Sequence, residues 1–144
     1  MIRLEPVDPC NWRLGLEVSE EQKRFVSYDM RILARAYAYR ESRSQAFIIR
    51  HGDTPVGMAM YYDWEPGKAY DFSQFFIDYR YQGKGFGMEA ARQVLDRMRR
   101  DGKYQKVVLC YIEGNEAARH MYEKLGFHLT GERDEDEIIM EMDL

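Results

Sequence analysis

The sequence predicts a single α/β domain of the α+β kind, built from about seven strands and about four helices. Apolar periodicity gives the order strand, two helices, three strands, helix, strand, helix and two strands. The chain has 144 residues, which is enough for one hydrophobic core. No linker, internal repeat or low-complexity segment interrupts the pattern, so residues 1–144 are predicted to form one domain.

The first predicted strand covers residues 2–7, where apolar and polar residues alternate, and Pro6 confines it to an edge. Asp8 or Asn11 is a suitable N-cap for a short helix that continues through Leu16. These residues therefore predict a strand followed directly by a short helix.

A second helix is predicted to begin after Ser19, because Ser19 and Gln22 have the spacing of a capping box. Its apolar stripe continues to about Tyr39, with a break near Ser27. Strands are then predicted at residues 46–50 and 56–62, joined as a hairpin by the turn at 51–55, and at residues 69–77.

The strand at residues 69–77 changes its phase of alternation. Tyr70 and Phe72 belong to one phase, whereas Phe75 and Ile77 belong to the other. One inserted residue, a β-bulge, produces such a change, although a fully buried strand end needs no alternation at all.

The C-terminal half begins with a predicted helix over residues 83–100 and a strand over 106–112 that is apolar on both faces and therefore central. A third apolar stripe starts at Asn115 and ends at Gly126. Strands at 127–131 and 138–142 are predicted to form a final hairpin around the acidic turn 132–137.

Composition excludes several classes of function. The net charge is -4, which argues against a nucleic-acid partner, and no apolar run approaches the length of about 20 residues that crosses a bilayer. The N-terminus lacks the pattern of a signal peptide, so a cytoplasmic protein with reduced Cys10 and Cys110 is expected. His51, His120 and His128 are scattered, and no metal site is predicted.

A glycine-rich turn separates an apolar strand from the helix at 83–100. A helix N-terminus exposes unpaired N–H groups, and glycines allow an anion to approach them closely. Met88 stands where a dinucleotide-binding G-x-G-x-x-G motif needs glycine, and Lys84 is not followed by the Ser or Thr of a P-loop. The turn therefore either holds another phosphate group or only begins a helix.

Two sequence motifs favour one particular family of phosphate-binding proteins. Residues 82–87 read QGKGFG and resemble the Q/R-x-x-G-x-G/A motif of the GNAT superfamily of N-acetyltransferases. Residues 115–127 read NEAARHMYEKLGF and resemble the N-x-x-A-x-x-x-Y-x-x-x-G-F ending of the same family. Residues 59–62 and 75–85 further resemble the spermidine/spermine (diamine) N-acetyltransferases.

The resemblance implies the GNAT fold, with a mixed, mostly antiparallel sheet and helices on both faces. It also implies transfer of the acetyl group of acetyl-CoA to a primary amine of a small cationic substrate such as spermidine or spermine. Relatives suggest a homodimer, with no nucleic-acid or membrane partner.

The same resemblance assigns roles to residues of the two motifs. Tyr122 would be the general acid that protonates the leaving thiolate, and Asn115 would bind the pantetheine arm. Without the resemblance, Tyr122 on an apolar helix stripe would be interpreted as a core residue. The backbone of Phe76, Ile77 and Asp78 would stabilise the oxyanion. The cofactor phosphates would be held by Gln82, Gly83, Lys84, Gly85, Phe86, Gly87 and Met88.

The general base is where this chain departs from the polyamine enzymes, because Ser73 occupies the position of their carboxylate. Asp71, two residues earlier, is the candidate base, acting through water. Residues expected to contact the amine are Glu21, Tyr61, Asp63, Glu65 and Ser73, since carboxylates and aromatic faces attract cations. The alternative for each of the acids is a solvated surface position.

Two other functions compete with a polyamine acetyltransferase. The first is the same chemistry on a protein N-terminus, a lysine, an aminoglycoside or an amino acid. The second is a non-catalytic module that only binds acyl-CoA; Tyr122 and the intact glycine turn argue against it.

Overall fold

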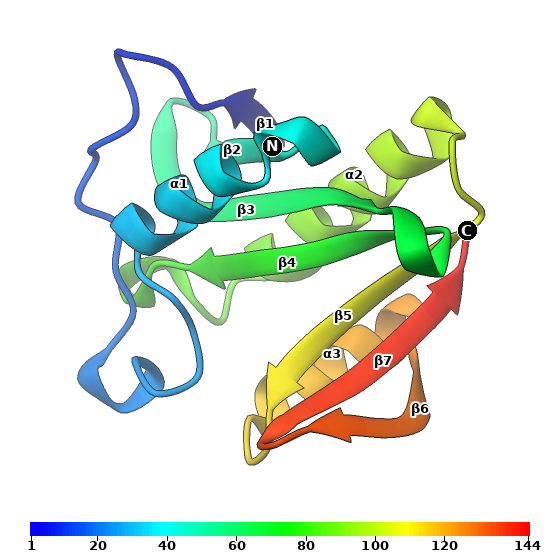
Figure 1. Cartoon of the computed structure of the whole chain (residues 1–144). Coiled ribbons are helices and arrows are strands. Elements are labelled where there is room, and N and C mark those ends of the chain that lie inside the picture. The colour runs from blue at the N-terminus through cyan, green and yellow to red at the C-terminus, as the bar shows by residue number, and fades with distance from the viewer.

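The computed structural model describes all 144 residues, and its centre is one seven-stranded sheet (Figure 1). The strands are β1 (Ile2–Pro6), β2 (Gln45–His51), β3 (Thr54–Trp64), β4 (Ala69–Ile77), β5 (Lys106–Ile112), β6 (His128–Asp134) and β7 (Glu137–Asp143). The α-helices are α1 (Asp29–Ala38), α2 (Phe86–Asp101) and α3 (Glu116–Leu125). Four 3₁₀ turns complete the chain, namely η1 (Glu20–Gln22), η2 (Arg40–Ser42), η3 (Glu65–Gly67) and η4 (Tyr79–Tyr81).

The sheet has the order β1-β2-β3-β4-β5-β7-β6, in which only β4 and β5 are parallel. The mixed, mostly antiparallel sheet is therefore confirmed. No helix is both long and apolar enough to cross a lipid bilayer.

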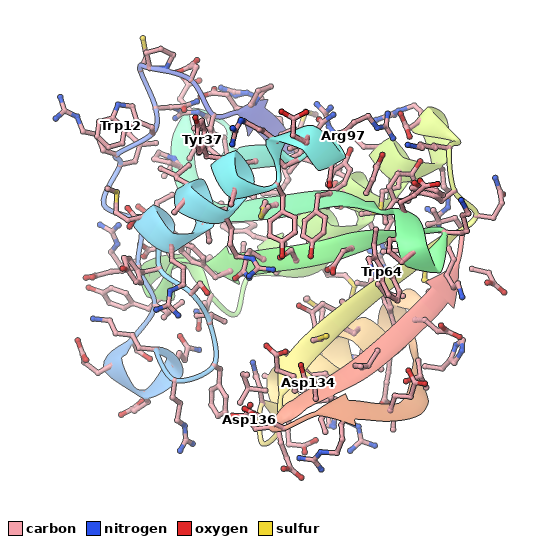
Figure 2. All side chains as sticks on the ribbon, in the orientation of Figure 1. Trp12, Tyr37, Trp64, Arg97, Asp134 and Asp136 are labelled. Carbon is pink, nitrogen blue, oxygen red and sulfur yellow. The ribbon has the colours of Figure 1, made fainter.

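Helices cover the sheet on both faces. In Figure 1, α1 lies in front of β2 and β3, whereas α2 and α3 lie behind the sheet. The apolar residues form two clusters accordingly: a larger one of 21 buried residues that includes the inner stripe of α2, and a smaller one of 8 that includes Ile32 of α1. The front of β5, β7 and β6 is not covered by a helix (Figures 1 and 2).

The predicted β-bulge in β4 is confirmed. Tyr62 pairs with Asp71 but Met60 pairs with Gln74, so β4 has one residue more than β3 between these pairs. The extra residue places Tyr70, Phe72, Phe75 and Ile77 against the same, larger apolar cluster in spite of their different phases.

Strands β4 and β5 are paired only at their beginnings. Tyr70 pairs with Val107 and Asp71 with Val108, and beyond the bulge the strands separate. Figure 1 shows the resulting V, which opens toward the ends of both strands. The edge of β4 from Phe72 to Ile77 therefore has no neighbouring strand on the β5 side.

The prediction of a short helix through Leu16 was wrong, and the structure has three α-helices rather than about four. The Asp8 side chain accepts hydrogen bonds from the N–H groups of Cys10 and Asn11 at 2.8 and 3.0 Å, and these bonds favour a turn over a helix. The break near Ser27 is confirmed, because η1 ends at Gln22 and α1 begins only at Asp29.

Candidate functional site

A cleft of about 410 Å³ lies in the V between β4 and β5. Its size is within the range of small-molecule sites. The 24 lining residues come from β4, the glycine turn, the start of α2, β5, α3 and the segment before α1, and none of them is charged. The cleft joins the two motifs of the sequence because both Gly83 and Tyr122 line it.

The glycine turn ends in α2 with its backbone open to the cleft. Gly83 and Gly85 have φ angles of 77° and 83°, which side chains other than glycine adopt only with strain. A Cβ at either position would have no atom within 4 Å, so the space in front of the turn is free. Gly87 instead allows close packing, because a Cβ there would lie 3.5 Å from Ile77 and Met121.

The backbone N–H groups of residues 82–88 donate no hydrogen bond within the protein. The N-cap Gly85 has no side chain that could satisfy the first turn of α2. Adjacent unpaired amides at a helix N-terminus bind an anion such as a phosphate. The predicted phosphate-binding residues therefore fit a diphosphate group, although the Lys84 side chain is exposed and does not line the cleft.

The free edge of β4 offers further donors. The N–H of Asp78 donates to the carbonyl of Val56 in β3 at 2.8 Å. Because successive strand residues direct their N–H groups to opposite edges, those of Phe75 and Ile77 face the open edge. The carbonyl of Ile77 is also on that edge, where it accepts a hydrogen bond from Gln82 Nε2 at 2.8 Å.

Within the predicted oxyanion-binding stretch Phe76–Asp78, only Ile77 thus directs its N–H into the V. Asp78 is fully buried outside the cleft. Its carboxylate accepts hydrogen bonds from the N–H of Glu17 and from Arg80, and these bonds lower its pKa despite burial.

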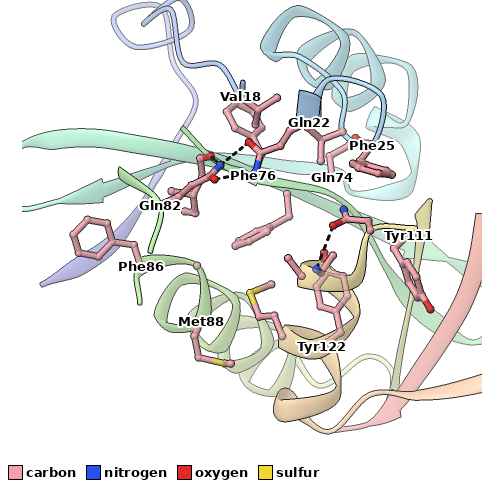
Figure 3. A pocket seen from close by; sticks show the side chains of 18 of the residues that line it. Val18, Gln22, Phe25, Gln74, Phe76, Gln82, Phe86, Met88, Tyr111 and Tyr122 are labelled. Atoms are coloured by element: carbon pink, nitrogen blue, oxygen red, sulfur yellow. Dashed lines mark hydrogen bonds between the residues drawn. The ribbon is translucent and has the colours of Figure 1, made fainter. Parts of the chain in front are cut away.

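Helix α3 places the second motif on the other wall of the cleft (Figure 3). Asn115 is the N-cap of α3, with its side chain accepting a hydrogen bond from the N–H of Ala118 at 3.3 Å. Gly126 ends the helix with a φ of 111°, and the ring of Phe127 packs edge-on against Tyr122 at 5.8 Å. The cap and this ring contact fix the position of Tyr122.

The hydroxyl of Tyr122 reaches the cleft. Its ring is buried, its Oη makes no hydrogen bond within the protein, and no buried side-chain N or O atom lacks a partner. The Oη must therefore be accessible, and the surface it meets is the cleft that Tyr122 lines. Burial raises the pKa of Tyr122 to about 12, so the phenol keeps its proton at neutral pH.

Asp71 lies next to the cleft but does not line it, because the lining of β4 begins at Phe72. Burial raises the pKa of Asp71, while a hydrogen bond from the Tyr62 hydroxyl and the charge of Arg35 act in the opposite direction. A carboxylate with a raised pKa is a stronger base than an ordinary one.

Acidic side chains extend from Asp71 along the uncovered face of β5 and β7. Desolvation by the surrounding protein, together with the negative charges of Asp71, Glu137 and Asp134, raises the pKa of the Cys110 thiol to about 11. Cys110 lines the cleft, and Figure 2 shows Asp134 at the end of β5 that lies away from β4. This side of the cleft is therefore electronegative, although the acids themselves lie outside its lining.

The structure separates three of the residues expected to contact the amine from the cleft. Tyr61 is buried behind the sheet between Phe47 and Tyr70. Asp63 and Glu65 lie at the opposite end of β4, near its first residues. Asp63 is buried in ion pairs with Arg43 and Lys103, while Glu65 pairs with Lys68 and accepts a hydrogen bond from Tyr104. The sequence shows that Asp63 and Glu65 are acidic, but it does not show which basic residues pair with them.

Of the two remaining candidates, one lines the cleft and the other is adjacent in sequence to a lining residue. Ser73 lines it, and its hydroxyl accepts a hydrogen bond from Arg35 Nε at 3.2 Å. Glu21 is exposed on η1, directly before the lining residue Gln22.

Several lining residues were not predicted as part of the site. Those before α1 and on β4 or β5 are Val18, Gln22, Phe25, Val26, Phe72, Gln74, Phe75, Cys110 and Tyr111. The capping box at Ser19 identified Gln22 as the start of a helical turn, but nothing in the local sequence connects that turn with a glycine loop 60 residues later.

Comparisons with known proteins agree with this geometry. The family model described as the acetyltransferase (GNAT) family matches residues 12–127. A spermine/spermidine N(1)-acetyltransferase of Bacillus subtilis is 35% identical over 86 residues, which are 55% of this chain and 56% of that protein. The matched part is thus about half the length of this relative.

Solved structures share the fold at low sequence identity. A spermidine N-acetyltransferase from Vibrio cholerae, in complex with CoA and spermine, superposes with a TM-score of 0.79 at 17% identity, covering 99% of this chain and 95% of that one. A GNAT family acetyltransferase from Elizabethkingia anophelis with acetyl-CoA bound gives a TM-score of 0.71 at 18% identity, with 99% and 98% covered.

Proposed function

The chain belongs to the GNAT family of acetyltransferases, and on this premise we propose that it transfers the acetyl group of acetyl-CoA to a primary amine of a small cationic acceptor. A polyamine such as spermidine or spermine is the proposed acceptor. The observation that carries this proposal is the cleft in the V between β4 and β5, which connects the unpaired amides of residues 82–88 with the hydroxyl of Tyr122.

Different protein groups along this cleft would bind the cofactor and stabilise the oxyanion. Acetyl-CoA, when bound, supplies an acetyl group activated as a thioester. The amides of residues 82–88 would bind its diphosphate, and Asn115 would contact the pantetheine arm. The N–H groups of Phe75 and Ile77 on the open edge of β4 are aligned donors for a developing oxyanion.

Two groups would handle protons. Tyr122 holds a proton at Oη and would donate it to the leaving thiolate, whose conjugate acid has a pKa of about 8.5. Asp71 would accept a proton from the acceptor amine through water, since it lies beside the cleft rather than in it. An alkylamine has a pKa near 10.4, so it is almost fully protonated at neutral pH, and a base must accept its proton before the nitrogen can attack.

The polyamine assignment is supported by the names of the Bacillus subtilis and Vibrio cholerae relatives. The carboxylates of Asp71, Asp134 and Glu137 beside Cys110 also favour a cationic acceptor.

A second acceptor class is favoured by Arg35. Its guanidinium bonds Ser73 at the cleft wall, and no charged residue lines the cleft itself. A positive charge at this position favours an acceptor that carries a carboxylate near its amine, such as an amino acid or a peptide N-terminus.

A panel of amines assayed by CoA release tests both candidates. Spermidine, spermine and putrescine represent the first class, and amino acids and peptide N-termini the second. Saturable turnover of a polyamine, absent with the second class, is the expected result. If only carboxylate-bearing amines react, the acceptor class changes; if no amine reacts and calorimetry detects no CoA binding, the proposed function fails.

A further inference from the structure

Two carboxamides form a reciprocal pair at the mouth of the cleft. Gln22 Nε2 donates to Gln82 Oε1 at 2.9 Å, and Gln82 Nε2 donates to Gln22 Oε1 at 3.0 Å (Figure 3). Both residues line the cleft, and they lie 60 positions apart in the sequence. The pair therefore joins the segment before α1 to the glycine turn.

Backbone groups at both ends orient this pair. Gln82 Nε2 also donates to the carbonyl of Ile77 at 2.8 Å, and the N–H of Ser19 donates to Gln22 Oε1 at 3.4 Å. Because the NH₂ of a carboxamide only donates and its oxygen only accepts, these contacts determine how each carboxamide faces. A continuous chain of hydrogen bonds thus runs from the free edge of β4 to the start of η1.

Residues 18–26, here called the strap, form the wall of the cleft that faces α2 and α3 (Figure 3). Four strap residues line the cleft, namely Val18, Gln22, Phe25 and Val26. Phe25 also reaches the other motif, because a Cβ on Gly114 would lie 3.7 Å from its ring, next to Asn115. The strap therefore extends from the glycine turn to the beginning of α3.

We infer that Gln22 is a positioning residue that couples the binding of acetyl-CoA at the glycine turn to the acceptor side of the cleft. This inference rests on the proposed function. A ligand on the amides of residues 82–88 restrains Gln82, and Gln82 restrains the strap through Gln22. When an acceptor then binds against the strap, less conformational entropy is lost because the strap is already ordered. Each ligand therefore raises the affinity for the other.

The substitution Gln22→Glu removes one of the two hydrogen bonds of this link. Glutamate keeps the oxygen that accepts from Ser19, and it is a preferred residue at this position of a capping box. Glutamate lacks the N–H group that donates to Gln82 Oε1, so its second carboxylate oxygen would face that oxygen. The expected result is a three- to tenfold rise, roughly the value of one hydrogen bond, in the KM for acetyl-CoA and in the Kd of CoA, with a smaller change in kcat.

The matched control is Glu20→Gln, which makes the reverse chemical change on the same short helix. Glu20 pairs only with Lys23 on the surface, so this variant should retain the wild-type KM and melting temperature. If Gln22→Glu also retains the wild-type KM while it melts at the wild-type temperature, the inference is overturned.

Hydrogen exchange of the wild-type protein tests the coupling without any variant. Adding CoA should slow exchange at residues 82–88 and also along the strap, and Gln22→Glu should confine the slowing to residues 82–88. Protection that stays confined to residues 82–88 in the wild type contradicts the inference but leaves the proposed function intact. Absence of CoA binding to the wild type would instead refute the proposed function.

Discussion

The hydroxyl of Tyr62 donates a hydrogen bond to Asp71 Oδ2 at 3.0 Å across the β3–β4 pair, directly before the bulge. The Tyr62 ring stacks on Tyr39 at 4.1 Å, which holds the phenol in place. The hydrogen bond from Tyr62 stabilises the carboxylate form of Asp71 and partly offsets the effect of burial on its pKa. Asp71 is thus a half-buried carboxylate whose basicity depends on an identifiable neighbour.

If Asp71 is the general base, Asp71→Asn should lower kcat/KM by about 100-fold, the lower end of what a general base contributes. The pH profile should also lose the acidic limb that belongs to this carboxylate. Asp53→Asn, an exposed change at the β2–β3 turn, serves as the control. Unchanged turnover in Asp71→Asn would remove Asp71 from the mechanism.

Removing the Tyr62 hydroxyl should change the pH profile in a defined direction. The hydrogen bond lowers the pKa of Asp71, so Tyr62→Phe should raise that pKa and move the acidic limb of kcat/KM to higher pH. The plateau at high pH should remain near that of the wild type. A shift to lower pH, or none, would show that Asp71 does not control the limb.

Tyr122→Phe should reduce kcat by about 100-fold and leave the Kd of CoA unchanged, because only the proton donor is removed. The phenol is protonated at all ordinary assay pH values, since burial raises its pKa to about 12. Tyr37→Phe is the control, as Tyr37 is exposed on α1. Equal turnover of both variants would contradict the role of Tyr122 as the acid.

Gly85→Ala should weaken CoA binding as well as the fold. An alanine at a φ of 83° costs about 1–2 kcal/mol of stability, and relief of that strain would move the amides at the start of α2. Gly52→Ala places the same kind of strain, at a φ of 60°, in the β2–β3 turn far from the cleft. Melting temperatures should fall for both variants, whereas calorimetry should detect weaker CoA binding only for Gly85→Ala.

Asp63→Asn separates a structural role from substrate binding. Asp63 is buried and accepts hydrogen bonds from Arg43 and Lys103. Loss of its carboxylate charge should therefore lower the free energy of unfolding by about 1.5–3 kcal/mol. The KM for spermidine should not change, because Asp63 lies at the opposite end of β4 from the cleft. Wild-type stability together with a raised KM would return Asp63 to the acceptor site.

Local patterns in the sequence were sufficient for most of the fold. The strands at 69–77 and 106–112 have the predicted bounds, and the phase change in β4 identified its bulge. The glycines of the turn, the N-cap Asn115 and the end of α3 at Gly126 were predicted because each depends on its immediate neighbours. The short helix through Leu16 failed for a local reason too, since side-chain bonds from Asp8 compete with helix formation.

The sequence by itself determined which residues alternate, where helices start and stop, and which backbone amides remain unpaired at the turn before α2. Only the tertiary structure decided that β4 and β5 separate after Asp71, that Gln22 meets Gln82, and that Asp63 is paired away from the cleft. The physical reason is that periodicity reports which face of a strand is buried but not which strand lies at its edge. Carboxylates and carboxamides likewise bind whichever partner the fold brings near, and that partner is distant in the chain.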